Sequence, residues 1–380
     1  VRLRTALQFS LNIPAIKAGL MNGVRHQLAR TRQFGIHYPP GTTAVVSESI
    51  GTLTMHPIDL LGAYGMIANG GVLMPRRTIL EVVDQHGTRI WPTTDSGPRG
   101  TRVASRQATY IITDILAGNT DRRVNPFWGR WRVTDGITSH RVRPAAYKTG
   151  TTTDNRDVHA YGYLAPPADP DLPALVAGVW LGNSDNAPND GKLSLDTSAP
   201  LWSAIMSEVS RGMPIERFER VRPKGLVEAR VDPFTGARAT SSTRNAVKEL
   251  FIAGTLPPRK PSTVVTRTID AATGLLWRDG CAGPRVTRQY TDFAAAEAGH
   301  PTWQRADRAW LARAARGPGV AGGPKGTRTS WFYGTGFYPF GHTWGAAVAP
   351  TAWCTVVPVA TPHPSGSPEP SASPAPSPPG

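Results

Sequence analysis

The sequence predicts an α/β (α+β) fold in which a small antiparallel sheet is flanked by helices. Three short strand-like runs, at residues 148–152, 160–164 and 175–181, are separated by polar turns. Tyr, Val, Trp and Leu between turn residues favour strands over a helix. Apolar residues at helical spacing before and after these runs predict the flanking helices.

Two helices are predicted at the start of the chain. Apolar residues at helical spacing place one over residues 2–9 and a second from Pro14 to Leu28. Ser10 and Asn12 fall in the turn between them. Both are favoured N-cap residues, so capping by itself accounts for their presence.

The next elements are predicted as scaffold. A helix is expected from Thr54 to Asn69, a hairpin over residues 80–91 and a Ser105-capped helix ending at Gly118. Residues 119–143 are interpreted as a loop over the cleft, in which the tryptophans pack. Pro200 is expected to open a helix that covers the sheet.

The first strand of the sheet carries the candidate chemistry, in the stretch Lys148-Thr149-Gly150-Thr151-Thr152. Lysine supplies a cation, the threonines supply hydroxyls, and an uncovered strand edge supplies N–H groups. Glycine weakens a strand interior unless something approaches the backbone closely there. This combination suits a carboxylate and a developing oxyanion.

Lys148 to Asn186 resembles the class A penicillin-binding proteins, in which a Lys-Thr-Gly strand precedes strands like Gly162-Tyr163 and Gly178-Val179-Trp180-Leu181-Gly182-Asn183. Leu3 to Lys17 is similar to the part of this family that carries its Ser-x-Asn motif. Ser184-Asp185-Asn186 also matches that motif, but it follows the Lys-Thr-Gly strand and is interpreted as a turn. The resemblance covers roughly residues 1–255 and implies the penicillin-binding-protein/β-lactamase-like transpeptidase fold.

The resemblance also implies roles for the matching residues. Ser10 would relay a proton, Asn12 would hydrogen-bond the substrate, and Lys148 would bias the proton network. The Thr151 N–H would be half of the oxyanion hole. The expected substrate-binding residues lie along one strand: Thr149, Gly150, Thr151 and Thr152. The family implies no cofactor and no metal.

One required motif is not in the sequence. The family's nucleophile is the serine of Ser-x-x-Lys, and no serine here has lysine three residues later. We therefore expect an N-terminally truncated domain that is inactive alone. Without the missing part, the sheet should expose an apolar face and a free edge, which predicts marginal stability.

Three regions are expected: residues 1–213 as the truncated transpeptidase domain, 214–316 as a small extension, and 317–380 as a Gly/aromatic and then Pro/Ser-rich tail. A short basic helix is predicted at residues 305–316. Cys281 and Cys354 either form one disulfide or remain two free thiols, and the sequence leaves both possibilities open.

The net charge of +15 indicates an acidic partner such as anionic lipid or a cell-wall polymer. No nucleic-acid-binding motif is present, so nucleic acid is not expected. No apolar run reaches the ~20 residues of a membrane span, and no signal peptide opens the chain. By resemblance, the parent protein would lie on the extracytoplasmic face of the bacterial membrane, held by an upstream anchor next to a glycosyltransferase domain.

The resemblance predicts a portion of a peptidoglycan D,D-transpeptidase, which cross-links stem peptides by serine acyl transfer. Its expected ligands are stem peptides and β-lactams, and other cell-wall synthesis proteins are candidate partners. One alternative is a non-catalytic wall-binding pseudoenzyme that has lost the nucleophile. Another is a D,D-carboxypeptidase or β-lactamase-like hydrolase, which differs only in using water as the acceptor.

Overall fold

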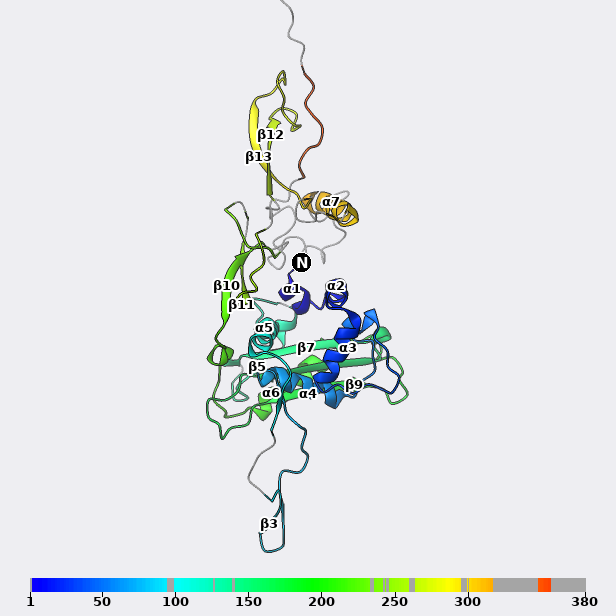
Figure 1. Cartoon of the computed structure of the whole chain (residues 1–380), viewed down its shortest axis with the longest axis vertical. Coiled ribbons are helices and arrows are strands. Elements are labelled where there is room, and N and C mark those ends of the chain that lie inside the picture. The colour runs from blue at the N-terminus through cyan, green and yellow to red at the C-terminus, as the bar shows by residue number, and fades with distance from the viewer. Residues whose placement is uncertain are drawn as a thin grey trace, which may run out of the picture. The chain divides into compact units, whose positions relative to one another are not determined.

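The computed structural model describes residues 2–93, 99–125, 127–138, 141–232, 236–241, 243, 246–259, 264–294, 299, 301–316 and 348–356. They form two compact units, one up to Thr263 and one from Val264 onward (Figure 1). The boundaries expected at residues 213 and 316 remain predictions. The expected Pro/Ser-rich tail lies outside the described residues.

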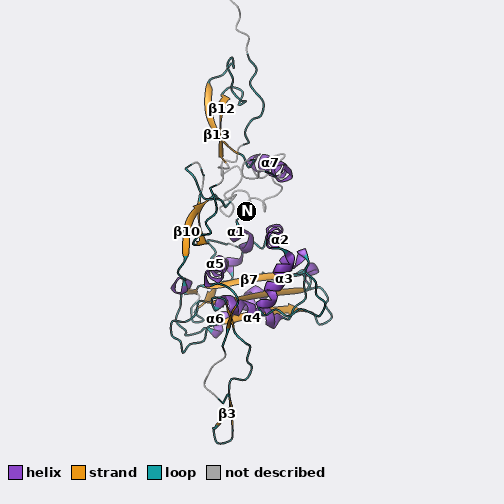
Figure 2. Ribbon diagram, viewed as in Figure 1, coloured by secondary structure: helices purple, strands orange, loops and turns teal. Residues whose placement is uncertain are grey.

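The first unit is built on a sheet of three antiparallel strands in the order β7-β8-β9. Figure 2 shows β7 in orange among the purple helices. The three strands are β7 (Ala145–Thr151), β8 (Asp157–Leu164) and β9 (Val176–Gly182). The three predicted strands are therefore confirmed. The polar turn between the first two is a short 3-10 helix, η4 (Thr153–Asn155).

One face of this sheet is buried under α6 (Ser198–Val209). Tyr147 points to this face and stacks on Trp202, with the ring centroids 4.7 Å apart and the planes 9° from parallel. Trp202 is fully buried and donates its Nε1–H to the carbonyl of Ala177 at 3.2 Å. A Cβ on Gly162 would lie 2.5 Å from the Trp202 ring, so this glycine makes room for the indole.

The opposite face packs against α4 (Pro57–Ala68) and α5 (Arg106–Ala117). Tyr163 is buried there, and its hydroxyl lies 2.7 Å from the Thr113 hydroxyl of α5. The predicted cap of α5 is confirmed, because the Ser105 hydroxyl accepts from the Ala108 N–H at 3.1 Å. The sheet thus lies between two helical layers.

Three helices begin the chain: α1 (Leu3–Gln8), α2 (Asn12–Asn22) and α3 (Val24–Gln33). The prediction of a single helix from Pro14 to Leu28 was wrong. The helix is interrupted at Gly23, whose φ of 86° lies in the region that favours glycine. The predicted hairpin is confirmed as β2 (Val82–Val83) paired with β3 (Arg89–Trp91).

The shorter elements complete the first unit. Strands β1 and β4 pair with each other, as do β5 and β6. The bounds are β1 (Val72–Leu73), β4 (Thr101–Arg102), β5 (Val133–Thr134), β6 (Val142–Arg143), η1 (Val46–Ile50), η2 (Gly118–Thr120), η3 (Trp128–Arg130) and η5 (Phe218–Val221).

A second hairpin of the first unit, β10 (Leu226–Val231) with β11 (Val247–Ile252), is fastened to α1. Glu249 of β11 pairs with Arg2 and with Arg4, whose Nε lies 2.9 Å from the carboxylate. Arg4 also reaches Asp114 of α5 at 2.6 Å. All the side chains of this cluster except Asp114 are at most one-fifth exposed. The hairpin therefore docks through partly desolvated ion pairs.

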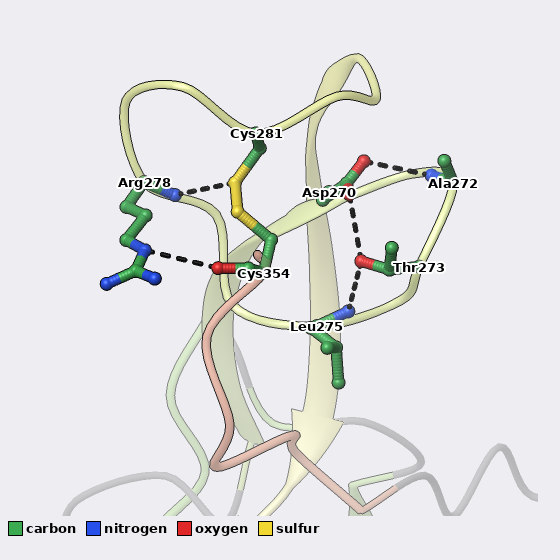
Figure 3. The surroundings of a disulfide bond; sticks show 7 residues. All are labelled: Asp270, Ala272, Thr273, Leu275, Arg278, Cys281 and Cys354. Atoms are coloured by element: carbon green, nitrogen blue, oxygen red, sulfur yellow. Dashed lines mark hydrogen bonds between the residues drawn. A yellow bond between two sulfur atoms is a disulfide. The ribbon is translucent and has the colours of Figure 1, made fainter. Parts of the chain in front are cut away.

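The second unit contains β12 (Val264–Asp270), β13 (Arg285–Thr291) and α7 (Pro301–Arg316), which confirms the predicted basic helix. Cys281 and Cys354 form a disulfide across 73 residues of sequence (Figure 3). Closing a loop of this length stabilises the folded state by about 4 kcal/mol. Among the described residues, no helix combines the length and the apolar composition that a membrane crossing requires.

The α6 layer should dominate the stability of the first unit. Trp202→Ala is expected to lower the free energy of unfolding by about 3–5 kcal/mol, because it empties a fully buried indole site beneath Tyr147. Urea unfolding measures this loss. The control is Trp180→Ala, which removes a 46% exposed indole from the same sheet and should cost much less. Equal losses in the two variants would contradict the assignment.

Candidate active site

The structure brings together two residues that the sequence separates by 138 positions. The Lys148 ammonium of β7 donates to the Ser10 hydroxyl at 2.8 Å. It also donates to the carbonyl of Thr149 at 2.6 Å. Ser10 is exposed in the turn between α1 and α2. A cation and a hydroxyl in direct contact can exchange a proton, which is the basic requirement of a relay.

Buried amides hold the Ser10 turn against the sheet. Asn119 donates its Nδ2–H to the carbonyl of Tyr147 at 3.0 Å. Asn125 donates to the carbonyl of Gln8 at 3.1 Å and to Asn119 Oδ1 at 3.0 Å. The Gln8 amide in turn donates to the carbonyl of Ile115 at 2.8 Å. Both asparagines are fully buried, so this chain of bonds fixes the end of α1 relative to β7.

The turn itself differs from a simple helix cap. The residue before α2 is Leu11, and no side-chain hydrogen bond caps the helix there. Ser10 adopts a φ of 54°, which is uncommon for a residue other than glycine. Its hydroxyl instead accepts from Lys148. Asn12 is exposed in the first turn of α2. The capping explanation of these two residues is therefore wrong.

The threonine hydroxyls of the strand already have partners within the protein. Thr149 is buried on the α6 side of the sheet, and its Oγ1 accepts from Trp128 Nε1–H at 2.7 Å. Thr151 donates to the Ser194 hydroxyl at 2.9 Å. Thr152 lies 3.2 Å from the Asp157 carboxylate. Lys148 and Thr149 lie on opposite faces of the sheet, as successive residues of a strand do.

Gly150 allows a close approach, and the approaching group is a side chain of the next strand. His159 is the direct cross-strand partner of Gly150. A Cβ at Gly150 would lie only 1.9 Å from His159 Nε2, so the imidazole lies over the glycine backbone. His159 also contacts Tyr161, with the ring centroids 5.5 Å apart. This histidine was missed in the sequence, where only its place opposite a strand glycine could have indicated it.

Burial lowers the pKa values of two basic side chains in this site. It lowers the pKa of Lys148 to about 8. It also lowers the pKa of His159 to about 4, and the nearby charge of Lys148 acts in the same direction. The imidazole is therefore neutral at neutral pH, and Lys148 loses its proton far more readily than a solvated lysine does.

Ser184-Asp185-Asn186 lies in the loop that leaves the third strand of the sheet. It forms the turn that follows β9, with Asn186 at a φ of 59°. The Asp185 carboxylate accepts from the Ala187 N–H at 3.0 Å, as in an ordinary Asx turn. The interpretation of this tripeptide as a turn is confirmed.

Comparison with solved structures supports the fold. Penicillin-binding protein 1A from Haemophilus influenzae aligns with a TM-score of 0.55 and 23% identity, over 68% of this chain and 41% of that chain. The chain therefore has the fold of the penicillin-binding-protein transpeptidase domains.

Sequence comparison also finds penicillin-binding proteins. A family profile described as "Penicillin-binding protein 1A, C-terminal domain" matches residues 222–259. Penicillin-binding protein 2D of Bacillus subtilis is 28% identical over 68% of this chain and 34% of its own length. Penicillin-binding protein 1A of Clostridium botulinum is 28% identical over 73% of this chain and 32% of its own length. The chain is thus similar to these penicillin-binding proteins, and it spans about a third of their length.

The lowered pKa of Lys148 predicts a pH dependence of stability. The unfolded chain binds this proton up to a pH near the ordinary value of 10.5, whereas the folded chain releases it near 8. Between these values the unfolded state binds more protons, so stability should rise with pH. Urea unfolding from pH 7.5 to 10.5 measures this rise. Lys148→Met should abolish it, while Lys192→Met, which removes an exposed lysine, should retain it. An identical profile for wild type and Lys148→Met would contradict the shift.

Proposed function

We propose that this chain supplies the proton-relay and substrate-carboxylate part of a peptidoglycan D,D-transpeptidase site. The observation that carries the proposal is the 2.8 Å contact between Lys148 Nζ and Ser10 Oγ. It joins the two motifs that the family places around its substrate, the Lys-Thr-Gly strand and the Ser-x-Asn turn. The relatives are named as penicillin-binding proteins, so the corresponding ligand proposed for this chain is a β-lactam.

The reaction is acyl transfer between stem peptides. A serine oxygen attacks the D-Ala-D-Ala carbonyl, the C–N bond breaks, and the terminal D-Ala leaves as an amine that needs a proton. In this proposal Ser10 passes that proton from Lys148, and Asn12 hydrogen-bonds the bound peptide. The positive charge of Lys148 attracts the terminal carboxylate, and the Thr151 N–H stabilises the oxyanion.

The proposal assigns the attacking serine to a segment other than this one, because the sequence holds no Ser-x-x-Lys. The same fact favours the second candidate, a non-catalytic wall-binding protein that keeps the substrate site. Hydrolysis by a carboxypeptidase or β-lactamase would use the same groups with water as the acceptor. A glycosyltransferase activity and a membrane anchor belong to the proposed whole protein. The Cys281–Cys354 disulfide supports an oxidising location outside the cytoplasm.

Intact mass after incubation with a fluorescent penicillin tests the missing nucleophile. The expected result is no covalent adduct, because none of the serines has the required lysine partner. A stoichiometric adduct would contradict this, and its loss in Ser10→Ala would assign the nucleophile to the Ser10–Lys148 pair.

Calorimetric titration with an N-acyl-D-Ala-D-Ala peptide tests substrate binding separately. Saturable binding is expected, and Lys148→Met should weaken it by about tenfold or more, since a bond to a charged group contributes about 1.5–3 kcal/mol. Lys192→Met is the matched control and should bind like wild type. Binding that is absent, or insensitive to Lys148→Met, would refute the proposed site.

A further inference from the structure

The turn that follows β10 recurs after β12. The first turn has the sequence Val231-Asp232-x-x-Thr-Gly236, and the second has Ile269-Asp270-x-x-Thr-Gly274. The two glycines have φ values of 70° and 71°. In the second turn the buried Asp270 carboxylate accepts from the Ala272 N–H at 3.0 Å and from the Thr273 hydroxyl at 2.8 Å (Figure 3).

Three backbone hydrogen bonds of the first turn recur in the second, with a constant shift of 38 residues. Asp232 N–H donates to the Ala237 carbonyl at 2.8 Å, and Asp270 N–H to the Leu275 carbonyl at 2.9 Å. The other two pairs of equivalent bonds are Gly236 N–H to Asp232 O with Gly274 N–H to Asp270 O, and Ala239 N–H to Arg230 O with Trp277 N–H to Thr268 O.

The strand pairing of the two hairpins is equivalent too. Val231 pairs with Val247 in the first, and Ile269 pairs with Val286 in the second. Four residues further from the turn, the Val227–Phe251 pair of the first hairpin corresponds to Val265–Tyr290. The hydrogen bonds and the apolar pairs coincide, so the two hairpins share one local architecture. The family profile covers only the first hairpin.

Between these two apolar pairs, on the same strand face, each hairpin has one further cross-strand pair. This pair differs in charge between the two hairpins. In the first hairpin it is Ala229 opposite Glu249, and in the second it is Arg267 opposite Arg288. Glu249 is the residue that binds Arg2, which precedes α1, and Arg4 within α1. The second hairpin thus carries two positive charges where the first uses one negative charge to dock a helix.

Two like charges directly opposite each other destabilise a hairpin. Within the described part of the chain neither arginine forms an ion pair. Arg267 is half-buried and donates to the carbonyl of its neighbour Thr266 at 3.2 Å, and Arg288 is exposed. The repulsion between the two arginines therefore destabilises the hairpin, and no ion pair among the described residues offsets it. An acidic partner would remove this repulsion.

We propose that the Arg267–Arg288 face of β12–β13 is a docking surface for an acidic protein segment. The segment presents two carboxylates beside an apolar patch, as the start of the chain presents Arg2 and Arg4 to Glu249. Val265, Val286 and Tyr290 flank the arginines, are partly exposed and provide the apolar contact, which favours a protein over a plain polyanion. The proposal does not depend on the proposed transpeptidase function.

A charge-reversed copy of α1 is the probe. It is a fluorescent peptide with the sequence of residues 1–9, carrying Arg2→Glu and Arg4→Glu and held helical by a side-chain crosslink. Fluorescence anisotropy with the full chain should show saturable binding. Arg267→Glu/Arg288→Glu should weaken it at least about tenfold, whereas Arg305→Glu/Arg308→Glu, the same charge change at exposed positions of α7, should leave it unchanged.

A further variant separates docking from folding. Arg267→Thr/Arg288→Thr removes the like-charge pair, so it should raise the thermal midpoint and still lose peptide binding. A lowered midpoint would mean that the arginines serve the fold, and would overturn the proposal. It is also overturned if the peptide does not bind, or binds all variants equally. Tighter binding of inorganic polyphosphate than of the peptide would assign the face to an anionic polymer instead.

Discussion

The register of β7 on β8 is the constraint on which the rest of the site depends. Tyr147 and Lys148 are neighbours, so the alternation of the strand sends them to opposite faces. Tyr147 is fully buried against Trp202, and this aromatic packing decides which face each residue takes. A slip by one residue would bury the ammonium under α6 and expose the tyrosine. The position of the reactive cation therefore follows from an apolar contact on the other side of the sheet.

Ser10 needs a second set of constraints, because it belongs to a distant segment. The C-terminal end of α1 is tied to the sheet through Gln8, Asn119 and Asn125. The N-terminal end is tied to β11 through Arg2 and Arg4 on Glu249. A short helix held at both ends has little freedom to move its last turn. The β10–β11 hairpin, which looks like a remote appendage in sequence, thereby contributes to the position of Ser10.

The sequence allowed the three strands of the sheet to be predicted, because they depend on local patterns, and the family resemblance placed Ser10 and Lys148 in one site without predicting their direct contact. Strand propensity and turns located β7, β8 and β9, and motif order located the two residues. The break at Gly23 was missed because apolar spacing continues through it. The hydrogen bond between Trp128 and Thr149 was missed because it depends on the path of a loop. The position of His159 over Gly150 was missed because it depends on strand register. The pairing of Cys281 with Cys354 was left open for the same reason: it joins segments that only the folded chain brings together.

The electrostatics of the site couple substrate binding to proton transfer in the proposed mechanism. Burial makes the proton of Lys148 easy to lose, and the lowered pKa of His159 keeps that ring uncharged beside it. A substrate carboxylate near Lys148 would favour the charged ammonium and raise its pKa. Lys148 would therefore take up a proton as the substrate arrives, at the stage when the departing amine will need one. The Ser10 hydroxyl, 2.8 Å from that ammonium, provides the path by which the proton can leave again.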